Sequence, residues 1–131
     1  MEEWVIVDTC IWASFFAKPD SPEKIAVDGL LDADRVAFIG PILAEVLLGL
    51  RRKDQADWVA SRMRMAHHLV IELKDWQGAA DLGRELAANG HKVPLTDLVA
   101  AAVASRRQVW VYTTDAHFDL FPRLKRFRPE A

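Results

Sequence analysis

Two acidic residues stand inside segments that otherwise have the composition of apolar helices. Glu45 is the only charged residue in GPILAEVLLGL (40–50), and Asp97 is the only one in TDLVAAAVAS (96–105). An ionised carboxylate in a dry interior costs several kcal/mol unless a partner compensates its charge. We therefore expect Glu45 to point inward or into a cleft, where other groups of the protein meet it.

Two further acids follow directly on strand-like runs. Asp8 ends WVIVD (4–8), and Asp115 comes just after VWVYT (109–113). Runs of β-branched and aromatic residues bounded by polar ones are typical of buried strands. Taken singly, such an aspartate more often begins a turn, and Asp97 alone is better explained by the dipole of its helix than by a functional role. Four acids at one edge of a sheet instead favour a functional site.

The chemistry open to four clustered carboxylates depends on what neutralises them. At an effective dielectric of about 20, two unit charges about 4 Å apart repel by roughly 4 kcal/mol, so the cluster needs protons or a cation. Oxygen ligands without His or Cys select hard cations, which makes Mg²⁺ or Mn²⁺ the expected occupant. Because magnesium also binds phosphate oxygens, the residues indicate phosphoryl chemistry.

Alternating strand and helix patterns must bring these acids together. The predicted strands cover 4–8, 35–40, 68–73 and 109–113, with an edge strand at 124–128. Helices are predicted at 11–17, 22–33, from Pro41 onward, 56–66, 75–90, 96–107 and, as a short one, 115–121. This alternation predicts a three-layer α/β/α sandwich with a mostly parallel central sheet. Ligands of such sheets bind beyond the carboxyl ends of the strands, which is where the four acids fall.

Two helices carry more detailed predictions. Thr96 is expected to cap the helix at 96–107. The helix at 75–90 is expected to place five residues on one face at helical spacing, namely Trp76, Ala79, Ala80, Gly83 and Ala87.

Length and composition indicate one domain, residues 1–131, without a membrane span. The 131 residues are 51% hydrophobic and 27% charged, as in ordinary globular chains. The net charge of −2 excludes a polybasic nucleic-acid binder, so RNA or DNA must be held by local patches or by metal. A single cysteine, Cys10, fits a reducing cytosol. No run approaches the roughly 18 apolar residues of a bilayer span, and Glu2 and Glu3 replace the basic start of a signal peptide, so we expect a cytoplasmic protein.

Four motifs in this order resemble the PIN domain, and within it the VapC-type toxin ribonucleases of bacterial toxin–antitoxin pairs. They are VDTCIW (7–12), AEVLLG (44–49), TDLVAAAVA (96–104) and YTTDAHF (112–118). Each motif is weak alone, but together they are fairly specific and span nearly the whole chain. The resemblance implies a PIN-like fold and Mg²⁺- or Mn²⁺-dependent endonucleolytic cleavage of RNA, in single-stranded or structured loops. It further implies a cognate antitoxin protein and a homodimer as partners.

The resemblance also implies roles for six residues of this chain. Asp8 and Asp97 are expected to be direct metal ligands, and Glu45 and Asp115 to bind the metal directly or through water. The implied catalytic set is therefore Asp8, Glu45, Asp97 and Asp115. Thr9 and Thr113 match hydroxyl positions beside the acids and are expected to orient carboxylates or water.

Several features keep more than one interpretation. The basic residues Arg123, Lys125, Arg126 and Arg128 either hold RNA phosphates or form a solvated edge strand, and we favour the edge strand. Trp12, Phe15 and Phe16 belong to the core or to a groove for an antitoxin segment. Trp58, Met63 and Met65 are candidates for a homodimer surface or for the core.

The alternative function is a non-catalytic RNA- or protein-binding module on a PIN-like fold. Loss of one of the acids would favour it, and none is lost. We do not count Cys10 or His117 among the site residues, although each is two residues from an acid of the set.

Overall fold

A computed structural model describes residues 3–129, and within them the chain forms six α-helices, four β-strands and one short 3-10 helix. The strands are β1 (Val5–Val7), β2 (Val36–Phe38), β3 (His67–His68) and β4 (Trp110–Tyr112). The helices are α1 (Thr9–Ala17), α2 (Pro22–Asp32), α3 (Gly40–Leu48), α4 (Lys53–Met63), α5 (Leu73–Ala88), α6 (Leu95–Arg107) and the 3-10 helix η1 (Ala116–Leu120).

The four strands form one parallel sheet in the order β3-β2-β1-β4. Val5 of β1 pairs with Val36 on one side and with Trp110 on the other. Strands β1 and β2 are buried along their whole length, as expected of parallel strands covered on both faces. Because all strands run the same way, their carboxyl ends lie at one edge of the sheet.

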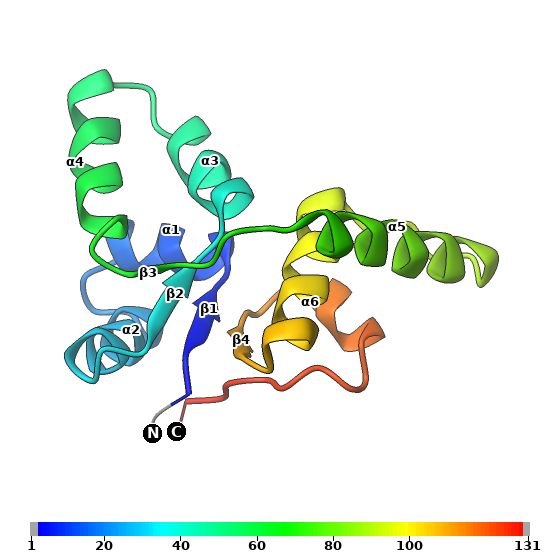
Figure 1. The fold of residues 1–131 in the computed structure, drawn as a ribbon. Helices are drawn as coiled ribbons and strands as arrows, with labels where there is room; N and C mark the ends of the chain where they lie inside the picture. The colour runs from blue at the N-terminus through cyan, green and yellow to red at the C-terminus, as the bar shows by residue number, and fades with distance from the viewer. Residues whose placement is uncertain (1–2, 130–131) are drawn as a thin grey trace.

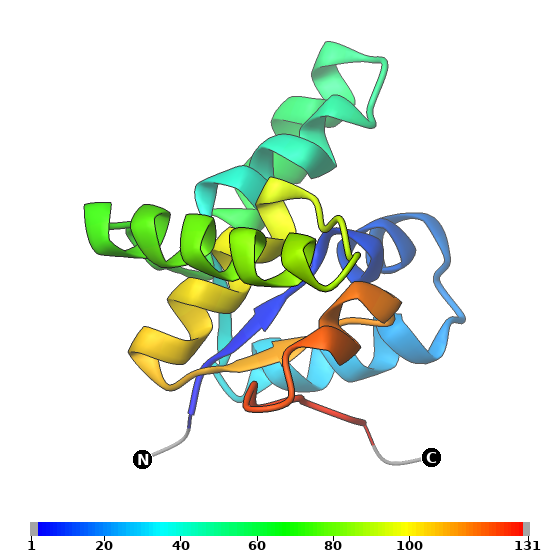
Figure 2. The same ribbon diagram turned by 90° about the vertical axis from the view of Figure 1, so that its right-hand side faces the viewer.

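The helices complete the predicted three-layer α/β/α sandwich. Figure 1 shows α1 and α2 on one side of the sheet and α5 and α6 on the other. Helices α3 and α4 form a hairpin that projects from this body, as both views show (Figures 1 and 2). None of the helices within residues 3–129 is long and apolar enough to cross a bilayer.

Helix α6 is the most deeply buried helix among those described. Every residue from Leu98 to Ala104 is buried, and the small alanines of this stretch allow close packing on both sides. Helix α5 approaches it so closely that a Cβ added at Gly83 would lie 3.0 Å from Cδ1 of Leu98. Because α6 leads back to the start of β4, its first turn, with Asp97, lies at the edge where the strands end.

The third strand and the helix after it differ from the prediction. The run 68–73 was expected to be a strand, but β3 contains only His67 and His68, and α5 already begins at Leu73. The backbone N–H of Glu72 donates to Oδ2 of Asp75 at 2.9 Å, a contact that stabilises the first turn of a helix. The local start signal of α5 therefore ends the extended segment early.

Three smaller predictions are also wrong. Thr96 does not cap α6, because the helix begins one residue earlier at Leu95, with Pro94 as its N-cap. The predicted face of α5 is rotated, since Trp76 is exposed while Asp75 and Ala79 are buried. The segment 124–128 makes only one bridge with the sheet, from Arg126 to Val111, so it is less regular than an edge strand.

Candidate active site

Asp8 lies between the end of β1 and the start of α1, for which it is the N-cap. Its Oδ1 accepts the backbone N–H of Thr9 at 2.8 Å, and its Oδ2 accepts the hydroxyl of Thr113 at 2.7 Å. The residue is only 4% exposed. The helix-capping role that could explain an isolated aspartate is thus real, but it occupies only one of the two carboxylate oxygens.

Thr113 joins Asp8 to Asp115 at the end of β4. Its hydroxyl oxygen accepts the backbone N–H of Asp115 at 2.9 Å while its proton is donated to Asp8. Asp115 in turn is the N-cap of η1 and accepts the backbone N–H of His117 at 2.9 Å. One hydroxyl therefore fixes the relative position of two acids that are far apart in the sequence.

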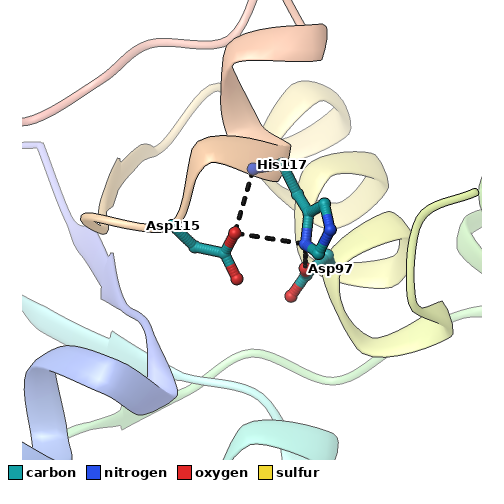
Figure 3. A group of neighbouring side chains, drawn as sticks. All are labelled: Asp97, Asp115 and His117. Carbon is teal, nitrogen blue, oxygen red and sulfur yellow. Dashed lines mark hydrogen bonds and ion pairs between the residues drawn. The ribbon is translucent and has the colours of Figure 1, made fainter. Parts of the chain in front are cut away.

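Asp97, Asp115 and His117 converge from α6 and from the β4–η1 connection, as Figure 3 shows. Nδ1 of His117 lies 3.0 Å from Oδ2 of Asp97 and 3.1 Å from Oδ1 of Asp115. Asp97 is 7% exposed. The imidazole nitrogen thus stands between two carboxylates that would otherwise face each other unscreened.

Glu45 reaches the site through Thr9. The hydroxyl of Thr9 donates to Oε1 of Glu45 at 2.7 Å, and the backbone of the same threonine contacts Asp8. Glu45 is exposed, so of the two predicted placements the one that points inward is wrong, and the placement in a cleft stays a prediction. Its apolar neighbours Ile42 and Val46 in α3 are buried, and the glutamate lies at the exposed rim beside them.

The environment raises the pKa of two of these carboxyls. Burial is the main cause of the raised pKa of Asp8, with the charge of Asp115 adding to it, although the bonds from Thr113 and Thr9 oppose the shift. Burial, followed by the charges of Asp8 and Asp115, raises the pKa of Asp97 to about 6, against the opposing effect of His117. The three aspartates thus repel one another as negative charges, which a cation would relieve.

The donors suited to a metal ion form a compact group. Asp97, Asp115 and His117 each offer one ligand atom, and these atoms all lie within 4.8 Å of one another. Two carboxylate oxygens and one imidazole nitrogen, inside a set of mutually repelling acids, fit a divalent cation such as Mn²⁺ or Mg²⁺. Asp8 and Glu45 lie outside this tightest group.

Sequence reasoning missed His117 as a member of the site. The signal was its position, because a residue two places after an N-cap aspartate in a single helical turn points back towards that aspartate. Cys10, which we did not count among the site residues, is half-buried, and its Sγ lies 3.7 Å from Oδ2 of Asp8 and 3.5 Å from the hydroxyl of Thr114.

A separate apolar cavity of about 690 Å³ lies among α1, α2 and α4. Trp12, Phe15 and Phe16 of α1 line it together with Trp58 of α4, and Lys24 and Arg62 add positive charge. We call it the aromatic groove. It contains exposed Trp58 and Met65, whereas Met63 is fully buried and cannot form a dimer surface.

The sequence matches the family model of the PIN domain over residues 5–124. Among solved structures, VapBC2 from Rickettsia felis, bound to a DNA fragment from its promoter, has a TM-score of 0.79 at 19% identity, covering 94% of this chain and 96% of that chain. DNA-bound VapBC from Salmonella typhimurium has a TM-score of 0.74 at 20% identity, covering 96% and 98%. The sarcin–ricin loop cleaving toxin VapC20 from Mycobacterium tuberculosis has a TM-score of 0.70 at 16% identity, covering 95% and 99%. No curated protein matches the chain by sequence.

Proposed function

The chain belongs to the PIN domain family, and on that premise we propose that it is a metal-dependent endoribonuclease and the toxin of a toxin–antitoxin pair. We propose Asp8, Glu45, Asp97 and Asp115 as its catalytic carboxylates. The single observation that carries the proposal is the convergence of Asp97, Asp115 and His117, whose donor atoms all lie within 4.8 Å of one another.

We place the metal at Asp97, Asp115 and His117, with Asp8 facing them and Glu45 at the rim. When bound, Mg²⁺ or Mn²⁺ would lower the pKa of a coordinated water and stabilise the charge that develops on the phosphate. The nitrogen of His117 favours Mn²⁺ over Mg²⁺, because imidazole binds magnesium poorly compared with oxygen donors.

Hydrogen bonds within the chain orient the carboxylates of the site before substrate binds. The hydroxyl proton of Thr113 is committed to Oδ2 of Asp8, so this hydroxyl orients the carboxylate and does not act as a nucleophile. Thr9 does the same for Glu45 through its side chain. Such fixed donors reduce the reorganisation that the acids need during reaction, which is the main source of electrostatic catalysis.

We propose single-stranded or structured RNA loops as the substrate. A recessed carboxylate site needs a backbone that can be splayed out of a helix, and looped RNA offers one. The fold similarity to a toxin that cleaves the sarcin–ricin loop supports this choice. We propose that this cleavage takes place in the cytoplasm.

We further propose a cognate antitoxin that occupies the aromatic groove. An apolar cavity of this size with exposed Trp58 at its edge fits side chains of a bound segment. The indole N–H of Trp12, which lines the groove, is buried without a hydrogen-bond partner among residues 3–129. The fold similarity to toxins solved together with their antitoxins supports a partner of this kind.

A homodimer is the last part of the proposal. Exposed apolar side chains outside the groove, such as Leu48 (83% exposed) and Leu73 (73% exposed), supply surface that a second copy would cover. Light scattering coupled to size-exclusion chromatography measures the oligomeric state, and a monomer at micromolar concentration would contradict this part.

Cleavage of a labelled single-stranded RNA tests the enzymatic proposal. EDTA is expected to abolish cleavage, and Asp8→Asn or Asp97→Asn to lower the rate at least about 100-fold, because each removes a charge that the metal needs. Asp81→Asn, which removes an exposed acid of α5, is the matched control. Circular dichroism checks that the variants stay folded, and full cleavage by both site variants would refute the assignment.

A further inference from the structure

The basic segment 123–128 contains Arg126, whose contacts were predicted neither by RNA binding nor by a solvated edge strand. We propose that Arg126 is a positioning residue of the carboxylate site, which holds the Thr113–Asp115 turn against η1. The catalytic consequence rests on the proposed nuclease function, whereas the consequence for metal binding does not.

The backbone of this segment aligns Arg126 with β4. The N–H of Val111 donates to the carbonyl of Lys125, and the N–H of Phe127 donates to the carbonyl of Val111, both at 2.9 Å. Arg126 therefore sits opposite Val111 in a parallel bridge. It lies just beyond residues 5–124, which the PIN family model matches.

The guanidinium of Arg126 reaches two different parts of the site's support. Its Nη2 lies 3.4 Å from the carbonyl oxygen of Thr113, and its Nη1 lies 3.1 Å from Oδ1 of Asp119 in η1. The side chain is only 13% exposed, and its Nε has no hydrogen-bond partner within residues 3–129. Because an incompletely paired, largely buried cation contributes little to stability, the value of these contacts lies in the geometry that they impose.

The two contacts lead directly to the acids. The hydroxyl of Thr113 joins Asp8 to the backbone of Asp115, so holding the carbonyl of Thr113 holds that junction from behind. The contact with Asp119 fixes η1, which also carries His117. Arg126 thus connects the turn that bears one metal donor to the helix that bears another.

Titration of the metal-free protein with Mn²⁺ tests this role without an activity assay. Electron paramagnetic resonance measures the concentration of free Mn²⁺ and so gives the Kd. Loss of a positive charge alone would tighten the binding of a cation. Loss of positioning would instead weaken it, and we expect Arg126→Gln to raise the Kd for Mn²⁺ about tenfold, as for other residues that orient metal ligands.

Two further variants separate geometry from charge and from folding. Arg126→Lys keeps the charge but cannot contact both Thr113 and Asp119, so it is expected to weaken Mn²⁺ binding as well. Arg128→Gln removes an exposed charge from the same segment and is expected to leave the Kd unchanged. Thermal unfolding confirms that each protein is folded at the assay temperature.

The RNA cleavage assay then extends the test to catalysis. We expect Arg126→Gln and Arg126→Lys to lower kcat at least about tenfold with little change in KM, because the acids and not the RNA contacts are displaced. Mn²⁺ binding by both Arg126 variants as tight as, or tighter than, that of the unmodified chain would overturn the inference. If the unmodified chain binds Mn²⁺ but cleaves no RNA, the proposed function fails and the binding comparison still decides the role of Arg126.

Discussion

Small neutral donors, and not large cations, make the direct hydrogen bonds to Asp8 and Glu45. Asp8 is bonded by the backbone of Thr9 and the hydroxyl of Thr113, and Glu45 by the hydroxyl of Thr9. Neutral donors orient a carboxylate without cancelling its charge. The arrangement therefore keeps the negative potential that a divalent cation would bind.

The pKa of Asp97 gives a prediction about stability. Its pKa of about 6 in the folded chain lies above the value of about 3.9 expected for an unfolded aspartate. The folded state therefore binds this proton more tightly, and the free energy of unfolding should fall as the pH rises from about 4 to about 6. The full shift corresponds to about 3 kcal/mol, which we reduce to about 1–2 kcal/mol because the neighbouring Asp115 and His117 are partly exposed and solvent screens their charges.

Chemical denaturation in EDTA at several pH values measures this effect. Asp97→Asn is expected to reduce the slope, leaving the contribution of Asp8, whose pKa is also raised. Asp81→Asn is expected to keep the slope, because it changes an exposed acid outside the site. Stability that rises over this pH range in both variants and in the unmodified chain would contradict the prediction.

The sequence was more informative about which acids lie near one another than about how they are arranged. Asp8, Asp97 and Asp115 could be selected because strand ends and a buried helix place them at one edge. The position of His117 indicated only its contact with Asp115, because its contact with Asp97 depends on how η1 is placed relative to α6. The exposure of Glu45 was missed for a similar reason, since its helix, α3, projects from the body instead of lying flat on the sheet.

At the level of elements, an ion pair joins the first turn of α5 to the last turn of α6, at the end of α6 away from Asp97. Nε and Nη2 of Arg106 donate to the two oxygens of Asp75 at 2.5 and 2.8 Å, and Nη1 lies 2.8 Å from Oε2 of Glu72. The Asp75 side chain is 1% exposed, and the bond from Arg106 lowers its pKa. The pair positions α6, whose first turn carries Asp97.

Removal of Arg106 should therefore destabilise the fold strongly. Arg106→Gln leaves the charge of Asp75 buried and unpaired, which typically costs about 3–5 kcal/mol. Arg107→Gln removes an exposed charge from the next position of α6 and should change the stability by less than about 0.5 kcal/mol. Urea denaturation at neutral pH measures both, and equal effects of the two changes would contradict the role given to the pair.

The order and type of most elements followed from their sequence patterns, because strands and helices differ clearly in period. Boundaries were less accurate where a tertiary contact decided them. The bonds of Asp75 to the backbone of Glu72 and to Arg106 were invisible in the sequence, and they set both the start of α5 and the face that it buries. Single-residue bridges, such as that between Val111 and Arg126, carry no periodic signal at all.

On the scale of the whole molecule, the structure separates a carboxylate site from an apolar surface. The site lies where β1, β4 and α6 meet, whereas the aromatic groove lies among α1, α2 and α4. Helix α1 belongs to both, since Asp8 is its N-cap and its later residues line the groove, namely Trp12, Phe15 and Phe16. A partner seated in the groove would therefore contact the helix that follows Asp8, which we propose as a catalytic residue.

Trp58 offers a way to test the groove without disturbing the site. Its ring packs against Phe16 and lies under Arg62, yet 52% of the residue is exposed, so a bound segment would cover it. Buried tryptophans often dominate binding energy, and we expect Trp58→Ala to weaken the antitoxin complex by at least about 2 kcal/mol, or roughly 30-fold. RNA cleavage by the free chain should not change.

Trp76→Ala is the matched control and should keep full affinity for the antitoxin. Trp76 belongs to α5, is 42% exposed and does not line the groove. The partner is first identified by co-purification from the native host and then titrated against each variant. Equal affinities for both variants would place the antitoxin on another face of the molecule.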